Sequence, residues 1–141
     1  MCGTRSDPRL RAVGEALADR GIACLRFDYG PWDEGEGERQ DASNVLASAR
    51  DRYEAVALFG YSFGAGVALL AAAESEPAAV SVLAPPATLG DADTVAALDS
   101  LPCPVQILHG ERDSTVEWEP VVDRARERGD TVESIPGDHF F

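Results

Sequence analysis

Residues 55–73 of the sequence read AVALFGYSFGAGVALLAAA, an apolar run, a glycine-rich turn and a second apolar run. The first five residues are typical of a buried strand, and the last nine favour a helix that is apolar on nearly all sides. The turn has the pattern G-x-S-x-G, which places Ser62 on a tight bend between strand and helix. At such a bend a Cβ on Gly60 or Gly64 is expected to clash. The pattern in this setting predicts that Ser62 is a nucleophile.

The rest of the chain alternates between helical patterns and short, continuously apolar runs. Strands joined by single helices form right-handed parallel crossovers, which place helices on both faces of the sheet. The predicted fold class is therefore α/β, an open and mostly parallel sheet with helices on both faces, in a single domain over residues 1–141. Helices are expected over residues 8–20, 42–49, 65–73 and 121–128, with a weakly helical stretch over 87–100, a loop over 30–37, and strands over 22–27, 55–59, 80–83, 105–108 and 131–135.

A serine at its ordinary pKa is a poor nucleophile and needs a general base. The chain has two histidines, His109 at the end of one predicted strand and His139 just after the last one. Where a serine sits on this kind of turn, the chain order is serine, acid, histidine. Only His139 leaves room for an acid after Ser62. We therefore predict that His139 is the base and that His109 is structural.

The acid that would orient His139 is expected in the loop after the strand 105–108. Asp113 lies a few residues beyond the strand end, where a loop can return it to the carboxyl edge of the sheet. Glu111 and Asp138 are the alternatives, although Asp138 directly precedes the histidine in the chain. The predicted role of Asp113 is to fix the tautomer of His139 and to stabilise the imidazolium.

Three segments together resemble the α/β-hydrolase superfamily, and within it the small lidless hydrolases described as dienelactone-hydrolase-like. They are residues 60–66 (GYSFGAG), 108–116 (LHGERDSTV) and 136–141 (PGDHFF). The resemblance covers nearly the whole chain and implies a Ser-His-Asp hydrolase that acts on an ester, a thioester or a similar acyl bond. Dienelactone hydrolases themselves carry cysteine where this chain has Ser62, so their substrate is not implied.

The resemblance also implies an oxyanion hole and a substrate site. One oxyanion donor would be the backbone N–H of Phe63, and the other would come from the region of Cys2 and Gly3. Family members have a strand before this region and a helix after the histidine, so we expect a truncated chain. Trp32, in the loop 30–37, and Tyr61 are the predicted substrate-binding residues, although Trp32 could equally pin its loop.

Composition limits the partners. The 141 residues carry a net charge of −13, and all 12 basic residues are arginine. Such a charge argues against nucleic acid and anionic membranes as partners. With the absence of lysine it favours a haloarchaeal, halophilic origin, and an ordinary acidic cytosolic protein is the alternative. The three cysteines are odd in number and lack metal-binding spacing, which favours a reducing cytoplasmic location. The sequence has no P-loop or GxGxxG motif and no cluster of cysteine and histidine, so we expect no cofactor and no metal. The expected partner is a small-molecule acyl substrate, and the oligomeric state is not predicted.

An alternative function stays open at this point. The chain could be a catalytically impaired remnant that keeps the triad residues and serves as a structural or interaction domain. An upstream coding segment with an apolar strand and an HGxG-like loop would favour the enzyme, and a genuine start at Met1 would favour the remnant.

Overall fold

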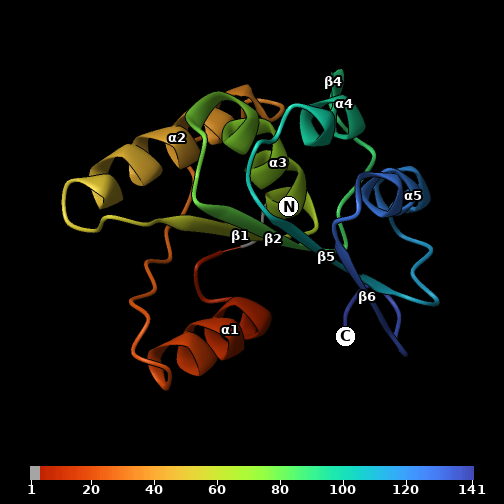
Figure 1. The fold of residues 1–141 in the computed structure, drawn as a ribbon, viewed down its shortest axis with the longest axis horizontal. Coiled ribbons are helices and arrows are strands. Elements are labelled where there is room, and N and C mark those ends of the chain that lie inside the picture. Colours follow the sequence, from red (N-terminus) through yellow and green to blue (C-terminus); the bar gives the residue numbers. More distant parts are fainter. Residues whose placement is uncertain (1–3) are drawn as a thin grey trace.

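The computed structural model describes residues 4–141, which form a four-stranded parallel sheet with helices on both faces (Figure 1). The strand order is β1-β2-β5-β6. The strands are β1 (Ala57–Tyr61), β2 (Ala79–Leu83), β5 (Val105–Gly110) and β6 (Thr131–Ile135). Their last residues are in register, with Tyr61 opposite Leu83 and Gly110 opposite Ile135. The loops that follow the strands therefore leave from one edge of the sheet, as the α/β prediction requires.

The helices are distributed unequally between the two faces. One face carries α2 (Glu36–Arg50), α3 (Phe63–Ser75), α4 (Thr94–Asp99) and α5 (Glu119–Arg128), whereas α1 (Pro8–Ala18) lies on the other face (Figure 1). The main core lies under the four helices, where Val82 and Ile107 of the sheet pack with Leu69 and Val121. The helix α1 has no buried residue. Burial of apolar surface therefore holds the four-helix face far more strongly than it holds α1.

Local sequence signals explain where several elements begin. Asp7 caps α1, because its side chain accepts a hydrogen bond of 2.9 Å from the backbone N–H of Arg9, and Pro8 occupies the first turn. Glu38 is buried in α2 and accepts hydrogen bonds from the N–H groups of Asp33 (3.1 Å) and Gly35 (2.9 Å). A buried carboxylate thus fixes the glycine-rich loop, which ends at residue 35 rather than at 37 as expected, because α2 already begins at Glu36.

One prediction of local structure is wrong, and another holds only in part. Residues 22–27 were expected to form a buried strand, but the structure has no strand there. Ile22 and Leu25 are 50% and 66% exposed. A strand exists only when its backbone pairs with a neighbour, and within residues 4–141 none pairs with this run. The stretch 87–100, expected to be weakly helical, contains a short hairpin, β3 (Thr88–Leu89) and β4 (Ala92–Asp93), before the helix α4.

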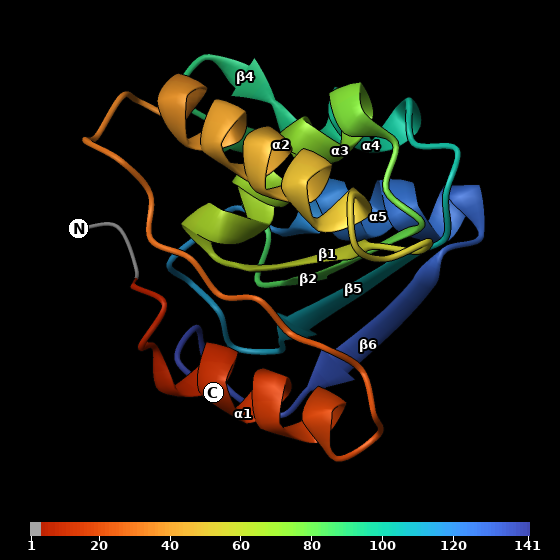
Figure 2. The ribbon, with the colours of Figure 1, turned by 90° about the vertical axis from the view of Figure 1, so that its left-hand side faces the viewer.

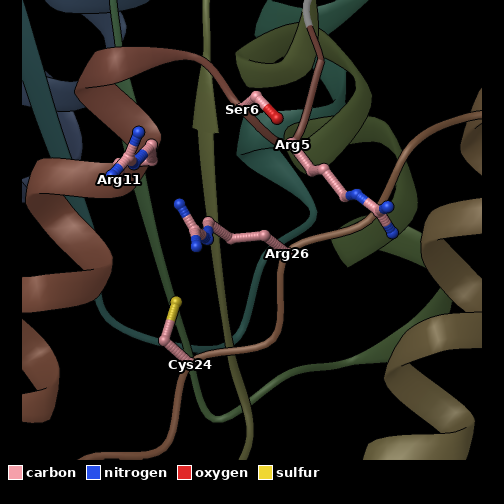
Figure 3. A pocket seen from close by; sticks show the side chains of 5 residues that line it. All are labelled: Arg5, Ser6, Arg11, Cys24 and Arg26. Carbon is pink, nitrogen blue, oxygen red and sulfur yellow. The ribbon is translucent and has the colours of Figure 1, made fainter.

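A pocket of about 400 Å³ lies between α1 and the extended segment 22–27. Its lining residues are Arg5, Ser6, Arg11, Cys24 and Arg26 (Figure 3). Arg26 extends toward α1, and its Nε would lie 3.8 Å from a Cβ placed on Gly14. The side chain of Arg26 therefore lies beside α1 and forms one wall of the pocket.

Candidate active site

The turn between β1 and α3 holds Ser62 in a strained backbone conformation. Its φ of 53° and ψ of −118° lie in a region that L-residues seldom adopt. The Ser62 N–H donates to the carbonyl of Leu83 (2.8 Å), and the Ser62 carbonyl accepts from the N–H of Ala65 (2.9 Å). These bonds tie the turn to the neighbouring strand and to the first turn of the helix, which keeps the Ser62 side chain at the carboxyl edge of the sheet.

The two glycines of the turn contribute differently, which corrects the prediction that both must lack a Cβ. A Cβ on Gly60 would lie 2.1 Å from the carbonyl oxygen of Gly64, a distance that no real contact allows. A Cβ on Gly64 would lie 3.6 Å from the hydroxyl of Tyr29, an ordinary van der Waals contact. Position 60 must therefore be glycine for steric reasons. Gly64 has room for a Cβ, and it is the Gly64 carbonyl that comes close to Gly60.

Ser62, His139 and Asp113 form a row of hydrogen bonds across the carboxyl edge of the sheet. The Ser62 Oγ lies 2.8 Å from the His139 Nε2, and the His139 Nδ1 lies 2.7 Å from the Asp113 Oδ2. The Asp113 side chain is fully buried and that of His139 is 5% exposed. The structure thus brings together three residues that follow three different strands and lie up to 77 positions apart in the chain.

The loop between β5 and α5 holds Asp113 at several points. The Asp113 Oδ1 accepts hydrogen bonds from the N–H groups of Thr115 (2.9 Å) and Val116 (3.4 Å). Its backbone carbonyl accepts one from the indole Nε1 of Trp118 (3.0 Å). Because one carboxylate oxygen is occupied by the loop, the other is directed at His139.

The alternative acids bind elsewhere. Glu111 accepts a hydrogen bond from the hydroxyl of Ser134 (3.2 Å), and Asp138 accepts one from the N–H of Phe140 (2.9 Å). Both of these contacts are exposed. Of the three acids considered from the sequence, Asp113 is the one whose carboxylate bonds to the His139 ring.

The loop that carries His139 lies directly over the end of β5. A Cβ on Gly110 would stand 2.6 Å from the carbonyl of Asp138, so the loop can approach only because Gly110 has no side chain. The N–H of Arg112 donates to the carbonyl of Gly137 (2.9 Å). The hydroxyl of Tyr61 donates to the carbonyl of His139 itself (2.9 Å). Burial raises the pKa of Tyr61, which keeps this hydroxyl protonated and able to donate.

His109 lies away from this row, inside the molecule. Its ring stacks on Trp118 with a centroid separation of 4.1 Å, and within residues 4–141 neither ring nitrogen has a hydrogen-bond partner. Burial holds the pKa of His109 below its usual value, so the ring is neutral at pH 7. His109 therefore packs against the residue that supports Asp113, in agreement with a structural role.

An aromatic cluster lies beside Ser62. The ring of Trp32 is 5.2 Å from that of Phe63, the residue after the serine, and the ring of Tyr29 is 6.0 Å from it. Trp32 is 61% exposed. The structure thus places one predicted substrate-binding residue, Trp32, against the ring of Phe63, the residue that follows the serine. The hydroxyl of the other, Tyr61, is engaged with the backbone of His139.

Of the predicted oxyanion donors, Phe63 lies in the described part of the chain and the other two residues do not. Phe63 is the first residue of α3, where a backbone N–H has no acceptor within the helix, so this group can bind a ligand oxygen. Cys2 and Gly3 lie outside the described residues. In the described part of the chain, no three side chains that ligate metals gather into a site, and no helix has the length and apolarity needed to cross a membrane.

Two contributions to the site were missed from the sequence. Trp118 bonds the backbone of Asp113, and Arg9 reaches the loop of His139 from α1. The five-residue spacing of Trp118 from Asp113 is a weak local signal for the first contact. Arg9 lies 131 positions from Phe140, the residue whose carbonyl it binds, and no pattern in the sequence joins them.

Comparison with known proteins agrees with the fold. A family model described as an alpha/beta hydrolase domain matches residues 3–141, and the chain belongs to this family. A solved structure described as an alpha-beta serine hydrolase homologue from Coxiella burnetii is 26% identical with a TM-score of 0.82, covering 99% of this chain and 71% of that one. XC6422 from Xanthomonas campestris, described as an a/b serine hydrolase without lid, is 28% identical with a TM-score of 0.80. The match covers 99% of this chain and 67% of that one.

Est1E from Butyrivibrio proteoclasticus is 22% identical with a TM-score of 0.87, covering 100% of this chain and 77% of that one, and it shows the shared fold alone. No curated protein matches the sequence.

Proposed function

We propose that the chain is a serine hydrolase that cleaves an ester, a thioester or a related acyl bond of a small molecule. The observation that carries the proposal is the row in which the Ser62 Oγ is 2.8 Å from His139 and His139 is 2.7 Å from the buried Asp113. A hydroxyl, an imidazole and a carboxylate in this order form an activated nucleophile. The serine hydrolases among the solved structures support the same activity.

In the proposed mechanism the Ser62 Oγ attacks the acyl carbonyl carbon while the His139 Nε2 takes the hydroxyl proton. Asp113 accepts the hydrogen bond from the His139 Nδ1–H, which fixes the tautomer and stabilises the imidazolium. The N–H of Phe63 donates a hydrogen bond to the carbonyl oxygen and so stabilises the negative charge that develops there. His139 then gives its proton to the leaving group, and a water molecule, activated by the same imidazole, releases the acid from Ser62.

The aromatic cluster favours an apolar acyl group. Trp32 presents an exposed ring whose centroid is 5.2 Å from that of Phe63, the residue after the serine, and this pair of rings would offer an acyl chain apolar surface. The alternative, a remnant without activity, is not favoured by the comparisons, because the chain belongs to the alpha/beta hydrolase family and the solved structures it resembles are described as serine hydrolases. A cytoplasmic location remains a prediction from the cysteine content.

A fluorophosphonate probe tests the nucleophile, with mass spectrometry to identify the modified peptide. We expect labelling at Ser62 and none in Ser62→Ala. Ser134→Ala is the matched control, because this serine is exposed on β6 and lies outside the row. Equal labelling of the parent and of Ser62→Ala would overturn the assignment.

Hydrolysis of p-nitrophenyl esters of increasing chain length tests the base and the acyl preference. We expect His139→Ala to lower kcat by about 10⁴-fold or more, because the members of such a row act as a unit. His109→Ala should have a far smaller effect on kcat. Equal losses in the two variants would contradict the roles proposed for the two histidines.

A further inference from the structure

The loop that carries His139 is connected to α1 by a polar bridge. The Arg9 Nη1 donates to the hydroxyl of Tyr61 (3.0 Å) and to the carbonyl of Phe140 (3.1 Å). Tyr61 in turn donates to the carbonyl of His139 (2.9 Å). Two successive carbonyls of the loop are therefore bound by one guanidinium and the hydroxyl that this guanidinium contacts. Figure 2 shows the C-terminal segment running beside α1.

The guanidinium is itself fixed in place. Asp7 binds it with both carboxylate oxygens, Oδ1 to Nε at 2.9 Å and Oδ2 to Nη2 at 2.7 Å. The centre of the guanidinium also lies 4.3 Å from the centre of the Tyr61 ring. The side chains of Asp7 and Arg9 are 14% and 26% exposed. A two-point carboxylate contact and a stacked ring leave the guanidinium little rotational freedom, so its remaining donor has a defined direction.

The bridge is important for the positions of both α1 and the loop over 136–141. The helix α1 has no buried residue, and the loop contains no helix or strand. Neither partner is positioned by an apolar core of its own. The polar contacts between them therefore help to hold α1 against the sheet. Together with the bond from the Arg112 N–H to the Gly137 carbonyl, they hold the backbone from which the His139 ring projects.

We propose that Arg9 is a positioning residue for His139, acting through Tyr61 and through the carbonyl of Phe140, so that the docking of α1 sets the alignment of the imidazole between Ser62 and Asp113. The inference rests on the proposed function for its kinetic consequence. Its structural consequence is independent of activity. A displacement of the order of 1 Å in a reacting group can lower a rate by about 10²-fold, so a loosened loop is expected to be visible in kcat.

The test compares Arg9→Met with Arg11→Met. Both variants remove one positive charge from α1, but among the described residues Arg11 bonds none of the members of the bridge. Tyr61→Phe is a second variant, because it removes only the hydroxyl and leaves the contact between Asp7 and Arg9 in place. It therefore keeps the test valid if Arg9→Met releases α1 altogether.

The kinetic measurement is the hydrolysis of p-nitrophenyl acetate. We expect Arg9→Met and Tyr61→Phe each to lower kcat by about tenfold or more with a small change in KM, whereas Arg11→Met stays within about twofold of the parent. The double variant should lose less than the product of the two single losses, because both residues act along one path. Equal kcat values for Arg9→Met and Arg11→Met in an active parent would overturn the inference.

A second measurement does not depend on catalysis. In proton NMR spectra, the His139 Nδ1–H that is bonded to Asp113 should give a protected low-field signal, and Asp113→Asn identifies it by its loss or shift. We expect this signal to exchange faster or to broaden in Arg9→Met and to persist in Arg11→Met. A signal that is unchanged in Arg9→Met overturns the positioning role even if the parent hydrolyses no ester, whereas an inactive parent with a sensitive signal overturns only the proposed function.

Discussion

The indole of Trp118 donates a hydrogen bond of 3.0 Å from its Nε1 to the backbone carbonyl of Asp113. The same ring stacks on the buried imidazole of His109. The carboxylate that faces His139 is thus connected, through one tryptophan, to the interior at the end of β5. This contact gives the loop between β5 and α5 a fixed point beside its functional carboxylate.

Trp118→Phe removes the indole N–H and keeps an aromatic ring against His109. We expect kcat to fall about fivefold, with the free energy of unfolding lowered by about 1 kcal/mol, the typical net value of one hydrogen bond. Ester kinetics and chemical denaturation measure the two effects. A variant unchanged in both would show that the bond does not position Asp113.

The turn at Ser62 offers a matched pair of substitutions. We expect Gly60→Ala to lower the free energy of unfolding by about 3 kcal/mol or to prevent folding, because its Cβ would meet the Gly64 carbonyl at 2.1 Å. Gly64→Ala should change this free energy by less than about 1 kcal/mol, since its Cβ would meet only the Tyr29 hydroxyl, at 3.6 Å. Thermal unfolding of both variants decides the comparison, and similar losses would contradict the asymmetry.

His109 predicts a specific pH dependence of stability. Burial lowers its pKa in the folded chain, whereas the unfolded chain binds the proton at about pH 6.5. The unfolded state therefore binds more protons in the window below about pH 6.5, and the free energy of unfolding falls as the pH drops through it. His109→Leu removes the titrating group, so its unfolding curve measured from pH 7.5 to 5 should be flatter than that of the parent. Parallel curves would show that His109 titrates alike in both states.

The charge of −13 predicts a response to salt. Repulsion between surface carboxylates acts over a Debye length of about 30 Å at 0.01 M salt and of about 3 Å at 1 M. We expect the unfolding temperature to rise from low to molar sodium chloride, despite the weakening of surface ion pairs such as that between Arg39 and Glu36. An unfolding temperature that is constant or that falls over this range would contradict both the repulsion argument and the halophilic interpretation.

The fold class and the residues brought together at the site could be predicted from the sequence. Both depend on local patterns or on the order of residues along the chain. The pattern around Ser62 specifies its own strand, turn and helix, and the order of acid and histidine selects Asp113 and His139 from few candidates. The prediction of a strand over 22–27 was wrong for a physical reason. The apolar character of a segment can be read from its own residues, but a strand also needs a neighbouring strand whose backbone pairs with it. The bridge from Arg9 to Phe140 could not be predicted, since contacts between residues 131 positions apart depend on the assembled fold.

The separation of 77 positions between Ser62 and His139 also has a consequence during synthesis. A ribosome that adds about 5–20 residues per second delivers His139 roughly 4–15 s after Ser62. Over that interval the nascent chain carries a serine without the imidazole that would take its proton. On the function proposed above, the Ser62 hydroxyl therefore remains an unactivated nucleophile until the loop that follows β6 has emerged and folded against α1.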